Sequence, residues 1–270
     1  MENNINPIGV FDSGVGGISL LQCIREELPC EDIIYIADSR YAPYGDKTRE
    51  YIEKRSIAIS EFLLEQKVKV IVVACNTATA AAINKMRSIY SLPIIGMEPG
   101  VKPAISITKS GTIGILATTE TINSEKFRVL TERFCNDCEI ITQACPGLVE
   151  KVEQISLTDN ETRKMVEKYV DALTSRGVDT IVLGCTHYLF LTDVIRQVAG
   201  EDIYVIDTGK AVAKEVSRRL KEADLTTESK RKGNEYFWTS GDTGKTKKII
   251  DQLWNKNSEV KSLPENYLMA

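Results

Sequence analysis

The chain has 270 residues, of which 43% are hydrophobic and 27% are charged, a composition that is ordinary for a globular protein. Its length predicts two domains at roughly 150 residues per domain. A formal net charge of -4 and a pI near 5.4 argue against general nucleic-acid binding, which normally requires a basic surface. No segment approaches the ~20 apolar residues of a membrane span, and the first residues do not resemble a signal peptide. Seven irregularly spaced cysteines favour a reduced, cytoplasmic protein.

Short β-branched runs alternate with helical segments along the first third of the chain. Such runs predict buried strands, and apolar side chains that recur at helical spacing predict helices. We expect strands at residues 8–11, 33–37, 70–74 and 93–97, and helices that begin at residue 18, span about 48–65 with Thr48 as N-cap, and span about 77–90. Strands that alternate with helices predict a parallel sheet with right-handed crossovers.

The loop after the first strand contains Asp12 and three glycines. A nucleotide-binding loop is one interpretation, but the third glycine of the dinucleotide fingerprint is missing and no P-loop lysine follows. A tight strand-to-helix turn explains the glycines. It does not explain the carboxylate of Asp12.

The order of strands repeats in the second part of the chain. The runs at 113–116, 140–144, 180–183 and 204–206 follow their counterparts with offsets of 105, 107, 110 and 109 residues. The tail is expected to hold a helix at 210–222, a strand near 236–238 and a helix at 243–254, and to complete the first domain. The predicted fold is α/β, with two pseudo-symmetric open parallel-sheet domains of related βα units facing across a cleft. The expected domains are residues 1–97 plus 208–270, and residues 98–207.

Cys75 and Cys185 end equivalent strands of the two units. At the start of a helix, backbone N–H groups and the helix dipole are expected to lower a thiol pKa from its usual value near 8.5. Packing of a small apolar side chain is the alternative. Two cysteines at matching positions favour chemistry over packing.

The spacing Cys135-x-x-Cys138 fits zinc or redox chemistry. A four-ligand site would have to recruit Cys145 and His187, which is the only histidine in the chain. This shortage of ligands argues against a metal, and Cys23, Cys30 and Cys145 are interpreted as packing residues.

A covalent cysteine enzyme needs one nucleophile, so a second thiol would add nothing. Moving a proton from one face of a carbon to the other requires a base on one face and an acid on the opposite face. A thiol serves in either role because its pKa lies near the operating pH. The paired cysteines therefore predict a racemase or epimerase.

Four segments together resemble the glutamate racemase family, bacterial enzymes that supply D-glutamate for peptidoglycan: Asp12-Ser13-Gly14-Val15-Gly16-Gly17, Pro43-Tyr44-Gly45, Ala74-Cys75-Asn76-Thr77-Ala78 and Gly184-Cys185-Thr186-His187-Tyr188. The resemblance implies a cytoplasmic homodimer, active in cell wall biogenesis and cell shape, that uses glutamate and binds neither nucleic acid nor membrane. It implies a two-base mechanism that needs no cofactor, in which Cys75 deprotonates D-glutamate and Cys185 deprotonates L-glutamate. Asp12 would assist the first thiol and His187 the second. The positions matching substrate-binding residues are Asp12, Ser13, Tyr44, Gly45, Asn76, Thr77, Thr118, Thr186 and His187.

Two departures from the family pattern concern the second half of the site. Leu189 replaces a proline after Tyr188, and Glu150 replaces a proline three residues before Glu153. Spacing assigns the family's catalytic glutamate to Glu153, although Glu150 competes for the role. A solvated helix face is the alternative for both.

Other functions stay open at this point. An aspartate racemase usually carries an acidic residue after its second Cys-Thr pair, where this chain has His187. A non-catalytic amino-acid-binding protein can use the same fold, but it would not need both cysteines. A cysteine hydrolase would need only one.

Overall fold

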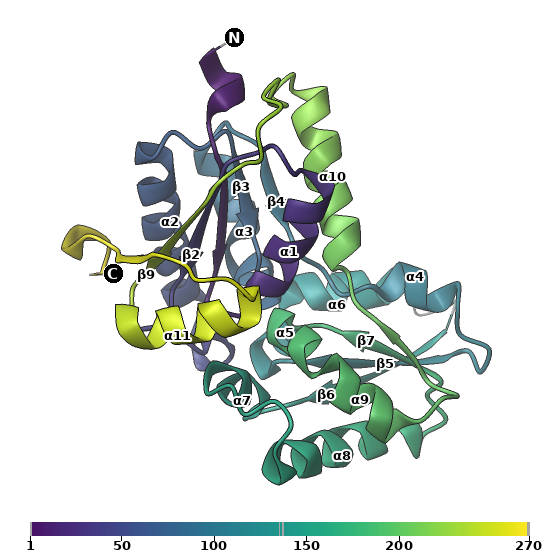
Figure 1. Cartoon of the computed structure of the whole chain (residues 1–270). Coiled ribbons are helices and arrows are strands. Elements are labelled where there is room, and N and C mark those ends of the chain that lie inside the picture. The colour runs from purple at the N-terminus through teal and green to yellow at the C-terminus, as the bar shows by residue number, and fades with distance from the viewer. Residues whose placement is uncertain (1, 135, 137, 269–270) are drawn as a thin grey trace.

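The computed structural model describes residues 2–134, 136 and 138–268. Within them, the strands form two sheets in which every paired strand is parallel (Figure 1). The first sheet has the spatial order β10 (Val260–Ser262), β9 (Glu235–Thr239), β2 (Ile33–Ala37), β1 (Ile8–Asp12), β3 (Val70–Val73) and β4 (Ile94–Gly96). The second has the order β6 (Glu139–Ala144), β5 (Thr112–Ala117), β7 (Thr180–Leu183) and β8 (Tyr204–Ile206). The predicted α/β fold with two parallel-sheet domains is confirmed.

The strand order β2-β1-β3-β4 of the first sheet recurs as β6-β5-β7-β8 in the second. The register agrees as well. Gly9 pairs with Ile34 and Ile71, and Gly114 pairs with Ile141 and Ile181. The first three predicted offsets are therefore confirmed.

The fourth predicted offset is wrong by two residues. In the ladders, Ile71 pairs with Ile94 and Ile181 pairs with Val205, so Val205 is the structural match of Ile94. The offset of 109 residues had matched Ile94 to Ile203. Both β4 and β8 are short edge strands. Their register is set by the neighbouring ladder and not by the similarity of a three-residue apolar run.

The C-terminal part of the chain joins the first sheet. β9 pairs with β2, and β10, which the sequence did not predict, pairs with β9 at the edge. Helix α10 (Gly209–Glu222) packs on α1 (Ile18–Glu27). The domain boundaries 1–97 plus 208–270 and 98–207 stay a prediction.

Helices cover both faces of the first sheet, which explains its continuous apolar strands. Val70 and Val72 pack on the side of α1, α10 and α11 (Thr243–Trp254). Ile71 and Val73 pack on the side of α2 (Arg49–Glu65) and α3 (Asn76–Ile89). The predicted cap of α2 is present, since Thr48 Oγ1 accepts a hydrogen bond from Tyr51 N at 3.3 Å.

The second sheet is covered in the same way. One apolar cluster joins it to residues of α4 (Val101–Ile105) and α6 (Glu125–Glu132). The other joins it to α7 (Leu148–Glu153), α8 (Asn160–Thr174) and α9 (Thr192–Ala199), and continues into the first domain. No helix among the described residues is long and apolar enough to cross a membrane.

The carboxyl ends of the two sheets face each other (Figure 1). The short helix η2 (Tyr44–Asp46), which follows β2, contacts α5 (Thr119–Asn123), which follows β5. Helix α1 contacts η3 (Thr186–Leu191), which follows β7. Ligands of open α/β sheets bind at carboxyl strand ends. This fold therefore brings the carboxyl strand ends of both sheets together at one place.

Candidate active site

The first half of the site surrounds Cys75, the N-cap of α3. Its Sγ accepts a hydrogen bond from Ala78 N at 3.4 Å and donates one to Ser13 Oγ at 3.7 Å. The Ser13 hydroxyl lies 3.5 Å from Asp12 Oδ1, to which it donates, and Gly17 N donates to Asp12 Oδ2 at 2.8 Å. A thiol, a hydroxyl and a carboxyl group thus form one connected chain.

The prediction that the helix terminus lowers the pKa of Cys75 is wrong. Burial raises the pKa of this thiol, and the nearby carboxylate of Asp12 raises it further. Only 5% of Cys75 is exposed, so desolvation of a thiolate outweighs one N–H donor. Burial also raises the pKa of Asp12. The proton therefore stays on Cys75 until a base or a positive charge comes close.

The second half of the site surrounds Cys185, which lies two residues after the end of β7 and is the N-cap of η3. Cys185 Sγ lies 3.9 Å from His187 Nδ1, and His187 Nε2 lies 2.9 Å from Glu153 Oε1. Glu153 Oε1 also accepts a hydrogen bond from Val15 N at 2.8 Å. When His187 Nε2 donates to Glu153, Nδ1 can accept the thiol proton of Cys185. Glu153 therefore links the second half of the site to the loop after β1.

The environment of His187 favours its charged form. Burial by itself lowers the pKa of the imidazole, but its hydrogen bonds to Cys185 and Glu153 and the charge of Asp12 outweigh burial. The net effect is a pKa well above the ordinary 6.5. A cationic imidazole beside Cys185 can stabilise a thiolate there.

We expect the Glu153→Gln variant to change how stability depends on pH. A raised histidine pKa contributes stability that is fully present below pH ~6.5 and is lost as the pH rises through the folded-state pKa. Glutamine keeps an acceptor but removes the charge, so it lowers the pKa of His187 in the folded state. The Tm advantage of the wild type over the variant should therefore shrink as the pH rises from about 6.5 into the alkaline range.

Thermal unfolding of both proteins across this range tests the prediction. Glu161→Gln is a matched control, because Glu161 pairs with Lys151 through a side chain that is 76% exposed. Its Tm difference from the wild type should not vary with pH in this range. A Tm difference for Glu153→Gln that is equally constant would contradict the contribution of Glu153 to the raised pKa of His187.

Hydroxyl groups from both domains meet beside the two thiols. Thr77 Oγ1 lies 2.9 Å from Thr118 Oγ1 and 3.1 Å from Thr121 Oγ1. Next to Thr77, the buried Asn76 Nδ2 has no hydrogen-bond partner. A buried amide without a partner is costly unless a ligand or water supplies an acceptor. Asn76 therefore indicates a polar ligand at this point.

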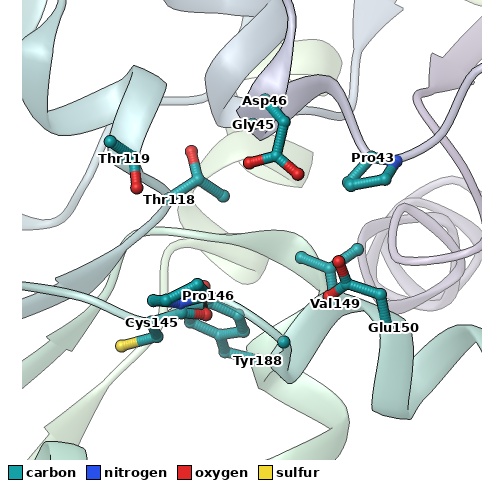
Figure 2. A pocket seen from close by; sticks show the side chains of 11 residues that line it. Pro43, Gly45, Asp46, Thr118, Thr119, Cys145, Pro146, Val149, Glu150 and Tyr188 are labelled. Atoms are coloured by element: carbon teal, nitrogen blue, oxygen red, sulfur yellow. Dashed lines mark hydrogen bonds between the residues drawn. The ribbon is translucent and has the colours of Figure 1, made fainter.

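An opening leads toward this region from the surface between the domains (Figure 2). One wall comes from the first domain, with Pro43, Gly45 and Asp46. The other comes from the second domain, with Thr118, Thr119, Cys145, Pro146, Gly147, Val149, Glu150 and Tyr188. Neither Cys75 nor Cys185 lines the opening, and each is buried. The domains are thus closed over the thiols.

The structure separates the two candidate glutamates. Glu153 contacts His187, whereas Glu150 lines the opening. Geometry therefore favours Glu153, which the spacing assigns to the family's acidic position, as the partner of the histidine.

Thr186 is buried, and its carbonyl accepts a hydrogen bond from Ser19 Oγ at 3.3 Å.

The predicted zinc alternative depends partly on Cys135, which lies outside the described residues. Cys145 lies with its Sγ 3.4 Å from the carbonyl of Gln143. Among the described residues, no group of three or more His, Cys, Asp or Glu side chains is arranged to hold a metal.

Side chains around the thiols break the symmetry of the fold. The register places Ala117 where the first domain has Asp12. Counting on from the equivalent strands β3 and β7 places Thr77 where the second domain has His187. Cys75 thus has a carboxyl neighbour and Cys185 an imidazole neighbour. Sequence analysis missed Thr121, Val15 and Tyr35, whose hydroxyl donates to Gly14 O at 2.8 Å. Val15 follows the carboxyl end of β1 and Thr121 lies in α5 after β5, which is the one signal that marks them. Tyr35 lies in the middle of β2, where no sequence signal marks it.

The chain is similar to a known protein family and to solved structures. The family model described as Asp/Glu/Hydantoin racemase matches residues 8–216. The chain is 49% identical to a glutamate racemase from Methylococcus capsulatus, over 99% of this chain and 98% of the relative. Its structure matches glutamate racemase from Bacillus anthracis, with a TM-score of 0.89 and 32% identity, over 97% and 98% of the two chains. It also matches the Francisella tularensis enzyme in complex with D-glutamate, with a TM-score of 0.85 and 27% identity, over 97% and 98%.

Fold and site define an isomerase of the amino-acid racemase class, with one thiol at the facing edge of each sheet. The chain belongs to the aspartate/glutamate racemase family. The relatives that it matches over nearly their full length support glutamate racemase activity.

Proposed function

We propose that this protein interconverts L-glutamate and D-glutamate by a two-cysteine acid/base mechanism that requires no cofactor. One observation carries the proposal: each facing sheet edge presents a thiol, and each thiol has its own ionisable neighbours. A covalent mechanism would leave one of these thiols without a role. The D-glutamate bound to the Francisella tularensis relative supports the choice of substrate.

In the proposed reaction, the α-carbon of glutamate lies between the two thiols. Cys75, as thiolate, removes the α-proton of D-glutamate, and the Cys185 thiol protonates the opposite face of the carbanion to give L-glutamate. In the reverse direction, Cys185 removes the proton of L-glutamate and Cys75 returns one. Each cycle moves one proton onto one sulfur and one proton off the other, so no redox partner is needed.

Ionisable neighbours tune the two thiols for this exchange. Asp12, through Ser13, is the group placed to take the proton of Cys75. His187, held by Glu153, performs the same role for Cys185. The substrate ammonium supplies a positive charge in a site where burial otherwise keeps Cys75 protonated.

Short polar groups surround the same space and suit a substrate with two carboxylates and one ammonium. We propose that Asp12, Ser13 and His187 contact the substrate as well as the thiols. The remaining proposed contacts are the backbone of Tyr44, whose phenol is bonded to Asp38, and Gly45, Asn76, Thr77, Thr118 and Thr186.

Incubation in deuterated water tests the function directly. With L- or D-glutamate and no added cofactor, optical rotation should fall toward zero while deuterium enters the α-position. L-Aspartate, as a parallel substrate, should react far more slowly. Absence of α-proton exchange with both glutamate enantiomers would overturn the proposal, and faster exchange with aspartate would favour an aspartate racemase.

We further propose that the D-glutamate serves peptidoglycan synthesis, and with it cell wall biogenesis and cell shape. The protein is proposed to act as a cytoplasmic homodimer. Its expected partner is the small-molecule substrate, with neither nucleic acid nor membrane involved.

A further inference from the structure

Arg55 lies at the centre of a buried polar network on the α2 side of the first sheet. It is 0% exposed, as is Asp38. Arg55 Nε donates to Asp38 Oδ2 at 3.0 Å, and Nη2 donates to Asp38 Oδ1 at 2.8 Å. The third nitrogen, Nη1, donates to the carbonyl of Tyr267 at 2.8 Å. The guanidinium carbon also lies 4.1 Å from the ring centre of Tyr41.

The same carboxylate holds the loop that follows β2. The phenol of Tyr44 donates to Asp38 Oδ2 of that carboxylate. The backbone N–H of Tyr41 donates to the main-chain carbonyl of Asp38 at 2.9 Å. Tyr44 is buried and is not among the residues that line the opening, because its phenol is held by Asp38. Its neighbours Pro43, Gly45 and Asp46 form the first-domain wall of that opening.

This wall has little freedom to shift without losing its fit to the second domain. A Cβ built on Gly45 would lie 3.0 Å from Thr118 Cβ, so the backbone of Gly45 already contacts the second domain. Thr118 in turn bonds to Thr77 next to the thiols. A displacement of the loop would therefore change the width of the opening and the position of Thr118.

We propose that Arg55 is a positioning residue for substrate binding, which acts through Asp38 and Tyr44 on the wall formed by residues 43–46. The inference rests on the proposed racemase function. A bidentate guanidinium fixes both the position and the plane of the Asp38 carboxylate. The free oxygen lone pair of that fixed carboxylate then orients the Tyr44 phenol. Lysine at position 55 would supply the charge but not the two parallel bonds.

The contact with Tyr267 gives the network a second anchor. Tyr267 belongs to η4 (Glu265–Tyr267), and the phenol of Tyr41 donates to the carbonyl of Leu268. The C-terminal segment therefore packs against the network that supports the substrate loop. Tyr267 lies far from Arg55 in the sequence, so no sequence pattern indicates that the two residues are in contact.

Arg25 provides a matched control for replacement of a buried arginine. It is also buried, it bonds to the carbonyls of Pro29 and Glu31 at 3.0 and 2.8 Å, and it pairs with Glu235 at 2.7 Å. These partners precede or begin β2 and β9, so they lie at the amino ends of the strands. The opening lies at the carboxyl ends of the strands, so Arg25 is at the opposite end of the sheet from it. Arg25→Met and Arg55→Met should both lower Tm.

The two variants should differ in kinetics. Arg55→Met is expected to raise the KM for glutamate about tenfold or more, because the loop contributes to binding of the ground state and the transition state alike, and to leave kcat within about threefold. Arg25→Met should leave KM unchanged. Equal KM values for the two variants at matched fraction folded would overturn the proposal.

Tyr44→Phe extends the test if Arg55→Met does not fold. It removes only the phenol hydroxyl and its bond to the Asp38 carboxylate, and KM should again rise about tenfold with kcat nearly unchanged, since bonds to charged groups contribute this much. An unchanged KM for Tyr44→Phe would also overturn the proposal. An inactive wild type would instead contradict the proposed racemase function, so the two failures are distinguishable.

Discussion

Replacement of Cys75 by serine is expected to lower racemisation in both directions by about 10²–10⁴-fold, the range that a general acid or base contributes. The change is nearly isosteric, so the fold and the cap of α3 should persist. A serine hydroxyl has a far higher pKa than a thiol, and the buried site raises the pKa even of Cys75. Serine therefore cannot become the base, and it is a poor acid toward the carbanion. Cys185→Ser should cause a loss of similar size.

Isotope exchange gives each variant its own signature. The Cys75→Ser variant still has Cys185, which can remove and return the α-proton of L-glutamate on one face. It should therefore exchange deuterium into L-glutamate with retention of configuration, and not into D-glutamate. Cys185→Ser should show the reverse preference. NMR of the α-proton together with chiral chromatography measures both quantities.

Cys23→Ser is the control for these variants. Cys23 lies partly buried in α1 near Gly209, with its Sγ 3.0 Å from the position of a Cβ on that residue. It has no contact with either thiol in the proposed site. Its replacement should leave both rates unchanged. Near-normal racemisation by either Cys75→Ser or Cys185→Ser would refute the two-base mechanism.

Gly16→Ala is expected to lower kcat/KM by about 100-fold or more, because a displacement of roughly 1 Å at catalytic groups costs this much. A Cβ at Gly16 would lie 2.3 Å from His187 Nδ1 and 2.6 Å from the ring carbons Cγ and Cε1. His187 is buried and bonded at both nitrogens, so the ring cannot turn away freely. The added methyl group must either displace the imidazole from Cys185 or separate the domains.

Gly244→Ala is the matched control. A Cβ there would meet nothing closer than Asp242 Oδ1 at 3.4 Å, which is an ordinary contact. Circular dichroism should show that both glycine variants are folded, and only Gly16→Ala should lose turnover. Near-normal kcat/KM for Gly16→Ala would show that the closed arrangement of His187 against this loop is not required for catalysis.

The same crowding explains why glycine occupies the loop after β1. A Cβ at Gly14 would lie 1.9 Å from Glu153 Oε1. The loop thus needs residues without a side chain in order to approach the second domain. The interpretation of these glycines as a tight strand-to-helix turn alone was incomplete. The carboxylate of Asp12 has its explanation in the same place, beside Ser13 and Cys75.

Local patterns predicted most of the elements correctly. The strand at 33–37 and the helix at 243–254 were predicted with the bounds that the structure shows. Periodicity suffices there, since these segments combine strong apolar patterns with clear caps or turns. The edge strand β10 was missed because its three residues are mostly exposed. A segment of this kind carries no hydrophobic pattern.

By itself, the sequence determined the duplicated βα order, the placement of Cys75 and Cys185 at matching strand ends, and the resemblance that predicted a racemase. These properties are encoded locally, in runs of apolar residues and the short polar segments that follow them. Only the tertiary structure decided that Glu153 and not Glu150 contacts His187, that burial raises the pKa of Cys75, and that Arg55 supports the substrate loop. Each of these depends on which distant segments exclude water and approach within hydrogen-bond distance, and such proximity is fixed only when the whole chain has packed.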